Sequence, residues 1–184
     1  MITRDDAYAL VTERIPQRNL VSHCVATELI MRALAERLGL GEEDVERWGL
    51  AGLLHDLDYA ETAEDFERHG HVTVEALAGR IDDEMLHAIL AHADKAPREN
   101  AFDHALWCAD PTTGFIVAAA LIRPEKKLAA VDVEALKKRW KEKAFARGAS
   151  REQMAGHEAL GLERDEFLSI SLSAMQAGAG QLGL

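Results

Sequence analysis

The chain has 184 residues, of which 48% are hydrophobic and 29% are charged. These proportions are those of an ordinary globular protein, and they exclude a disordered, collagen-like or low-complexity chain. The formal net charge of −11 argues against general binding to nucleic acid or to an anionic membrane surface.

Nearly the whole chain is predicted to be helical, because Ala, Leu, Glu and Arg dominate and β-branched runs are scarce. The clearest break is expected at Pro111, which separates a helix ending at Ala109 from one beginning at Thr112. The second of these is apolar on nearly all sides and is expected at the centre of the fold. In chain order, the first seven helices are expected at residues 3–15, 19–38, 42–54, 69–80, 83–92, 102–109 and 112–122.

The part of the chain after Pro124 is predicted to contain shorter and more charged helices, at residues 133–147, 151–160 and 163–175, followed by a frayed tail. Residues 123–147 hold nine basic and four acidic residues, against 12 basic and 28 acidic in the remainder. A solvated helical face explains this basic patch, and the alternative is that some of its cations attract a phosphorylated substrate. We expect a single all-α domain over residues 1–184, with a core at about 18–122 and a helical extension at about 125–178.

The two cysteines, Cys24 and Cys108, do not suggest a disulfide framework. A reducing, cytoplasmic location is therefore expected. No apolar signal region follows the first residues of the chain, and its apolar runs are too short to cross a bilayer. The sequence does not indicate an oligomeric state.

Four polar residues in or beside apolar helices form the strongest candidate for a chemical site. His55 and Asp56 follow an apolar helix, and His23 lies in the long helix before it. Asp110 stands at the expected proline break. A buried histidine is costly without a partner, and two histidines with two carboxylates in one helical bundle suit a divalent metal. Taken singly, each is more often a core histidine or a helix cap.

The segment Ala51-Gly-Leu-Leu-His-Asp-Leu-Asp-Tyr59 resembles the signature of the HD superfamily of metal-dependent phosphohydrolases. The resemblance covers about residues 18–122 and implies an HD-domain helical bundle. Mixed histidine and carboxylate ligands suit Mn²⁺, Mg²⁺, Fe²⁺, Co²⁺ or Ni²⁺, and they fit a structural zinc site less well. The primary metal ligands that the resemblance implies are His23, His55, Asp56 and Asp110.

A subset of the superfamily holds two metals, which are commonly bridged by the aspartate of the doublet. His69 and His92 match the two additional histidines of that subset, so the resemblance implies one or two ions in this chain. His71 competes with His69 for this role, and the register with Glu75 favours His69. The other histidines, at positions 87, 104 and 157, match no ligand and are assigned to the surface or to structural roles.

Two departures from the superfamily pattern bear on the substrate. Asp58 and Tyr59 replace a Gly-Lys pair, so a lysine that often binds substrate phosphate is missing, and Asp58 becomes a candidate hydrogen-bond partner of a metal-bound histidine or water. The Gly-Tyr-Pro motif of cyclic-dinucleotide phosphodiesterases is absent after His92, which weighs against cyclic di-GMP. Weaker candidates for phosphate contacts are Lys95, Arg123, Lys126 and Lys127.

The leading hypothesis is hydrolysis of a phosphate ester by a metal-activated water, with Asp56 and Asp110 as catalytic carboxylates. A phosphomonoester or nucleotide is favoured over a phosphodiester, and the expected partner is a small phosphorylated molecule rather than nucleic acid or a membrane. The second hypothesis is a di-iron oxygenase acting on a small organic molecule, because a minority of the superfamily uses the same six ligands. The third is a non-catalytic metal-binding module, which the intact ligand set disfavours.

Overall fold

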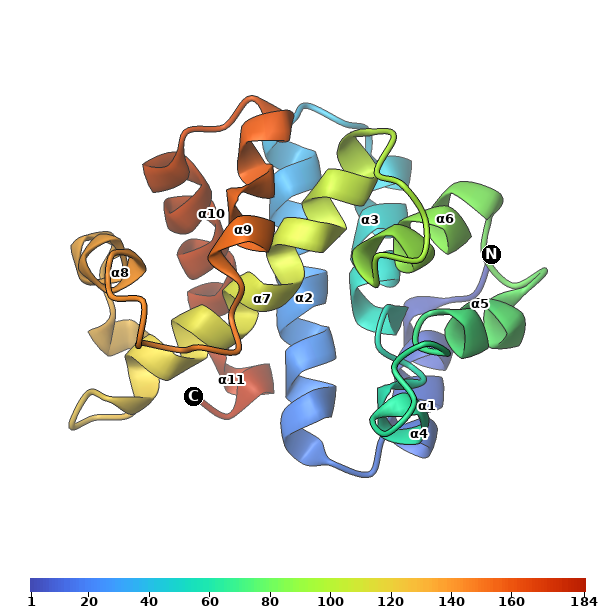
Figure 1. The fold of residues 1–184 in the computed structure, drawn as a ribbon, viewed down its shortest axis with the longest axis horizontal. Coiled ribbons are helices and arrows are strands. Elements are labelled where there is room, and N and C mark those ends of the chain that lie inside the picture. Colours follow the sequence, from blue (N-terminus) through green and yellow to red (C-terminus); the bar gives the residue numbers. More distant parts are fainter.

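The computed structural model describes residues 1–184, and every regular element in it is a helix. The two longest helices, α2 (Arg18–Arg37) and α7 (Ala101–Leu121), cross at the centre of the molecule (Figure 1). None of the helices combines the length and the apolar character that a membrane span requires. The all-α class expected from the composition is confirmed.

One side of α2 is covered by α3 (Glu42–Leu54), and α1 (Arg4–Arg14) packs on α3 in turn. The face of α2 that enters the core carries Ile30, Met31 and Leu34, all fully buried. Apolar residues at this helical spacing form a stripe that must be covered by neighbouring helices. The long second helix therefore supports the rest of the fold.

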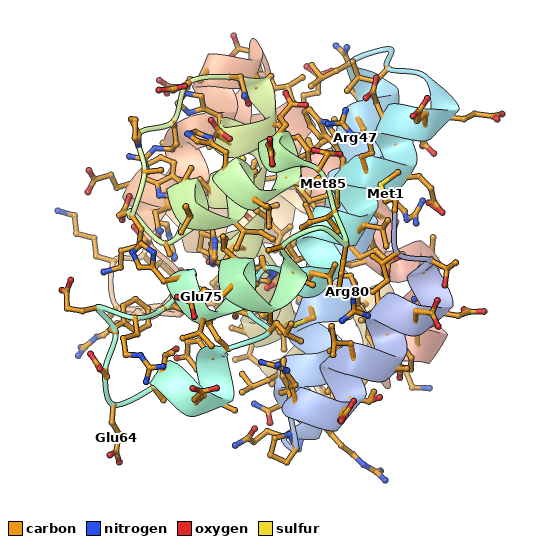
Figure 2. All side chains as sticks on the ribbon, turned by 90° about the vertical axis from the view of Figure 1, so that its right-hand side faces the viewer. Met1, Arg47, Glu64, Glu75, Arg80 and Met85 are labelled. Carbon is orange, nitrogen blue, oxygen red and sulfur yellow. The ribbon has the colours of Figure 1, made fainter.

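Three further helices close the side of the molecule that Figure 2 turns to the viewer. They are α4 (Tyr59–Thr62), α5 (His71–Leu77) and α6 (Asp83–His92). Met85 of α6 is fully buried, whereas Glu64, in the loop after α4, points away from the molecule (Figure 2). Residues 55–58, between α3 and α4, form a series of turns.

Pro111 lies inside α7, so the predicted break between Ala109 and Thr112 is wrong. Proline removes one backbone hydrogen bond and usually kinks or ends a helix. Here the helix is buried along most of its length, and the Thr112 hydroxyl donates a 2.7 Å hydrogen bond to the carbonyl of Cys108 next to the missing bond. Burial of an almost wholly apolar helix outweighs the cost of the proline. Asp110 consequently lies in the middle of a continuous helix.

The chain after α7 packs on the same hydrophobic core. The predicted helix at 133–147 ends at Trp140, because a series of turns follows it. The tail that was expected to fray instead forms a short helix against the N-terminal half of α2 (Figure 1), with Leu182 buried. The elements of this segment are η1 (Leu128–Ala130), α8 (Val133–Trp140), α9 (Arg151–Met154), η2 (Ala155–Leu160), α10 (Arg164–Ala177) and α11 (Ala179–Leu182).

Replacing Asp82 by alanine is expected to destabilise the fold by about 1 kcal/mol at neutral pH, because Asp82 caps α6. Its Oδ1 accepts a 3.0 Å hydrogen bond from the Met85 N–H, and Arg47 donates to both of its oxygens. The hydrogen bonds from Arg47 hold the pKa of Asp82 below its usual value, against the smaller effect of burial. The contribution is thus present above the unfolded-state pKa, near 4, and is lost as the pH falls through the lower folded-state value.

Urea unfolding at neutral and acidic pH measures this effect. Asp82→Asn is the matched control, because asparagine still caps the helix but carries no charge for Arg47. We expect an intermediate loss for Asp82→Asn at neutral pH. A deficit of Asp82→Ala that stayed constant down to strongly acidic pH would contradict the assignment.

Candidate metal centre

One half of the centre joins α2, the end of α3 and α7. The Nε2 atom of His23, on α2, lies 3.2 Å from His55 Nε2, 3.3 Å from Asp56 Oδ2 and 3.1 Å from Asp110 Oδ1. His55 Nε2 in turn lies 3.4 Å from Asp56 Oδ2. His55 caps the C-terminal end of α3 and Asp56 follows it in the turn, so the two neighbouring side chains can reach the same point. The structure thus brings together the four residues that the sequence singled out first.

The other half of the centre lies on the opposite oxygen of the same aspartate. Asp56 Oδ1 is 3.4 Å from His69 Nε2 and 3.5 Å from His92 Nε2. One carboxylate therefore faces two groups of histidines, each through its own oxygen. Three sets of ligand atoms lie within 4.8 Å of one another: His23, His55 and Asp56; His55, His92 and Asp110; and Asp56, His69 and His92.

Backbone carbonyls orient two of the four histidines. The Nδ1 atom of His55 lies 2.8 Å from the carbonyl of Gly52, and Nδ1 of His92 makes a short contact with the carbonyl of Ile89. A carbonyl oxygen only accepts, so each Nδ1 must carry the proton. In the neutral form of each ring the lone pair is then on Nε2, which faces the centre and is the atom that can bind a metal.

Side chains orient the other two histidines. His69 Nδ1 lies 2.8 Å from Asp58 Oδ1, and His23 Nδ1 lies 2.7 Å from the Thr113 hydroxyl. The Thr113 hydroxyl donates to the carbonyl of Asp110, so its oxygen is free to accept from His23. All four histidines are thus held with Nε2 toward the same point, the arrangement of metal-binding histidines and their supporting partners.

A buried nitrogen without a partner supports a cation at this point. His92 is 3% exposed, and its Nε2 makes no hydrogen bond. Leaving such an atom unpaired in the interior costs about 1–3 kcal/mol, so we expect this nitrogen to bind a ligand. Histidine nitrogens combined with carboxylate oxygens suit borderline and hard divalent ions. The residues present therefore fit a divalent metal, and the His/Asp cluster can hold one.

The centre is closed on one side and open on the other. The side chains of His55, His69 and His92 are almost completely buried, whereas those of His23 and Asp110 are 21% and 27% exposed. The centre is therefore most accessible from the side of α2 and α7.

A cavity of about 360 Å³ lies on this open side. Four of its lining residues, Asn19, Ser22, His23 and Ala26, recur on one face of α2, and others come from α7 and from the C-terminal segment. None of the ten lining residues is Lys, Arg, Asp or Glu. We call this cavity the α2–α7 pocket.

The charges of the centre favour a cation. Burial lowers the pKa of His23, but the hydrogen bonds and charges of Asp110 and Asp56 outweigh it and raise the pKa to about 10. Burial would raise the pKa of both carboxyl groups. Instead it is lowered for Asp56, by His55 above all, and for Asp110, by its hydrogen bond with His23. In the metal-free protein a proton on His23 thus balances part of the negative charge.

Metal binding is expected to release a proton. His23 is protonated at neutral pH in the metal-free protein, because its pKa is about 10, and only the neutral ring can bind a metal through Nε2. At pH values below that pKa, the apparent metal affinity should therefore rise about tenfold for each unit by which the pH is raised. Titration calorimetry in buffers of different ionisation enthalpy counts the released protons. An affinity and heat independent of pH and buffer would refute this expectation.

His69, and not His71, points into the centre. His69 is 3% exposed, whereas His71 is the exposed first residue of α5. The predicted start of a helix at position 69 is wrong, because Gly70 between the two histidines has a φ of +81° and turns the chain. Glu75, whose register favoured His69, is itself exposed on α5 (Figure 2) and has no part in the arrangement.

Asp58 supports this turn and is only 1% exposed. Besides His69, its carboxylate accepts hydrogen bonds from the N–H groups of Gly70 and Thr73, at 2.9 and 3.0 Å. Burial raises the pKa of Asp58, but His69 and these N–H groups lower it overall. Sequence reasoning proposed Asp58 as a partner of a metal-binding histidine, and the structure places it against His69.

Asp58→Asn is expected to weaken metal binding at the His69 and His92 side by about 10–100-fold. The amide NH₂ group of asparagine must face either His69 Nδ1–H or the two backbone N–H groups, and both are donors. Titration with metal, followed by metal analysis after gel filtration, measures the loss. Asp65→Asn, at an exposed position in the neighbouring loop, is the matched control. Equal metal affinity in the two variants would contradict a role of Asp58 in supporting the metal-binding histidine His69.

The four candidate phosphate-binding cations are not gathered at the centre. Lys95 is three residues beyond His92, and its Nζ pairs with Glu67 at 3.2 Å. Arg123 lies thirteen residues beyond Asp110, which corresponds to about 20 Å along a helix. It lines a separate pocket with Lys138 and Arg139. Lys126 and Lys127 follow it on the surface.

Thr113 and the C-terminal contribution to the pocket were missed by sequence reasoning. The only signal for Thr113 is its position three residues after Asp110, which places both on one face of a helix. Two of the three histidines assigned to other roles make contacts outside the centre. His87 contacts Asp103 at 3.2 Å, and His157 is buried with its Nδ1 2.8 Å from the carbonyl of Leu162.

Comparison with known families supports the same interpretation. The family model described as the HD domain matches residues 20–136, which is more than half of the chain. The chain belongs to the HD domain family. The family is generally one of hydrolases that bind divalent metals. Comparison with curated proteins and with solved structures found no match.

Proposed function

We propose that this protein hydrolyses a phosphate monoester or a nucleotide at a centre of two divalent metal ions. The observation that carries the proposal is the position of Asp56, whose two oxygens face two separate groups of histidines. With these histidines, the Asp56 carboxylate would help to hold two divalent ions, the set used by two-metal hydrolytic sites. Family membership adds the expectation of hydrolysis.

Divalent ions, when bound, lower the pKa of a coordinated water and neutralise charge on the phosphoryl oxygens. His55, His69 and His92 are buried and serve only to hold the ions. Asp110 is a ligand on the open side, where its carboxylate can also orient a water molecule and accept its proton. The buried side of the centre excludes bulk water, which strengthens each of these electrostatic interactions.

The experiment is an assay of the purified protein, loaded with Mn²⁺, on p-nitrophenyl phosphate and a panel of nucleotides. Release of inorganic phosphate that disappears with a chelator and returns with Mn²⁺ supports the proposal. Absence of turnover on every phosphate ester, in protein shown to contain two ions, would exclude it. That result would favour the non-catalytic metal-binding module.

A di-iron oxygenase is the second candidate. The observation that favours it is the α2–α7 pocket, which has no Lys or Arg side chain to bind a phosphate. Iron analysis and absorption spectroscopy of protein purified in air distinguish the two functions. About two irons per chain with a mixed-valent signal, together with oxygen-dependent turnover of a small organic molecule, would favour the oxygenase over the hydrolase.

A further inference from the structure

The α2–α7 pocket begins at the metal centre and leads away from it. His23 belongs to both, since its Nε2 faces the other ligands and its ring lines the pocket. On α7, Asp110 is followed at helical spacing by Gly114, Val117 and Leu121, all on one face. The pocket therefore extends along α7 from the open side of the centre, and a molecule reacting there places its remaining atoms in the pocket.

Five of the ten residues that line the pocket are apolar. Ala26, Val117, Leu182 and Leu184 line it, and Leu121 is 50% exposed at its edge. Its polar side chains are uncharged hydroxyl and amide groups, apart from His23 itself. Beyond His23, an anionic tail would find no Lys or Arg side chain here, and a tail rich in hydrogen-bonding groups would find few partners.

We propose that the substrate carries an uncharged, mainly apolar organic group, such as an alkyl or aryl chain, and that this group binds in the α2–α7 pocket. The proposal rests on the proposed function for the reaction itself and narrows its substrate to the phosphate monoester of an apolar alcohol, rather than a nucleotide. Binding the apolar group removes its surface from water. Each methylene group fully transferred contributes a factor of about four in affinity.

Gly114 offers a direct test, because it lines the pocket and a Cβ at this position would have no atom within 4 Å. Gly114→Leu is therefore expected to fill the pocket without disturbing the backbone of α7. Gly148→Leu is the matched control, because it makes the same change at an exposed glycine whose Cβ would also have no neighbour. Gly148 lines neither the α2–α7 pocket nor the pocket of Arg123.

The experiment compares ethyl phosphate, hexyl phosphate and AMP as substrates of the Mn²⁺-loaded protein. It also measures the binding of ethylphosphonate and hexylphosphonate by calorimetry. We expect kcat/KM and affinity to be at least about tenfold higher for the hexyl than for the ethyl compound. Gly114→Leu should remove this difference, whereas Gly148→Leu should keep it, and AMP should be a poorer substrate than hexyl phosphate.

The two readouts separate failure of this proposal from failure of the proposed function. Hydrolysis without a preference for the longer chain, a better reaction with AMP, or an equal effect of Gly114→Leu on both chain lengths would overturn the pocket assignment and leave the hydrolase in place. A second outcome is that no ester is hydrolysed but hexylphosphonate binds more tightly than ethylphosphonate, and that Gly114→Leu abolishes this difference while Gly148→Leu does not. That outcome would support the pocket assignment and exclude hydrolysis.

Discussion

Replacing Asp56 by alanine is expected to lower phosphate-ester turnover by at least about 10³-fold, because it removes the carboxylate that faces both halves of the centre. Metal ions contribute several kcal/mol to the stabilisation of a hydrolytic transition state, and that free energy corresponds to such a factor in rate. No other side chain contacts all four histidine Nε2 atoms. The variant should therefore also lose bound metal.

Metal analysis and circular dichroism accompany the assay of Asp56→Ala. The fold should persist, because Asp56 lies in a turn and the hydrophobic core does not depend on it. Asp65→Ala, at an exposed aspartate, is the matched control and should keep full activity. Turnover by Asp56→Ala within about tenfold of the unmodified protein, with a normal metal content, would be incompatible with the catalytic assignment.

Gly52→Val is expected to destabilise the fold by about 3 kcal/mol and to disrupt the metal centre. A Cβ at Gly52 would lie 2.9 Å from backbone atoms of Thr27 and Glu28 on α2, and backbone cannot move aside as the end of a side chain can. The two helices would have to separate along their most extensive contact. The carbonyl of Gly52 also accepts the hydrogen bond that orients His55, so its displacement would misplace a ligand.

Urea unfolding and metal titration of Gly52→Val measure both effects. Gly148→Val is the control, since a Cβ there meets nothing. A loss of less than about 1 kcal/mol at position 52 would show that α2 and α3 can adjust freely. It would also mean that the close approach of α2 and α3 does not require a glycine one turn before the His55–Asp56 doublet.

Several helices were predictable because their signals are local. The predicted helix at 42–54 coincides with α3, and that at 83–92 coincides with α6, whose cap Asp82 directly precedes it. The bounds of the long helix predicted at 19–38 differ from those of α2 by one residue at each end. Repeated apolar positions, caps and flanking glycines act over a few residues, so the sequence alone reveals them.

The errors arose where tertiary contacts override local signals. Pro111 is a helix breaker by its own chemistry, yet burial of α7 keeps the helix continuous. The tail at 177–184 is rich in glycine, yet Leu182 is buried and its helix packs against α2. Neither contact is visible in a window of neighbouring residues.

The candidate site divides in the same way. Chemistry and position in the helices suggested His23, His55, Asp56 and Asp110, whereas His69 and His92 came only from the resemblance to the superfamily. The choice of His69 over His71 depends on the positive φ of Gly70, which no periodicity predicts. The α2–α7 pocket depends on a C-terminal segment that is distant in sequence from the other walls.

The most direct test of a two-metal centre is anomalous diffraction from crystals of the protein loaded with Mn²⁺. We expect two peaks about 3.5–4 Å apart, one on each side of the Asp56 carboxylate. One should lie among His23, His55 and Asp110, and the other should lie beside His69 and His92. An absence of anomalous signal at this carboxylate, in protein that binds the metal elsewhere, would contradict the account.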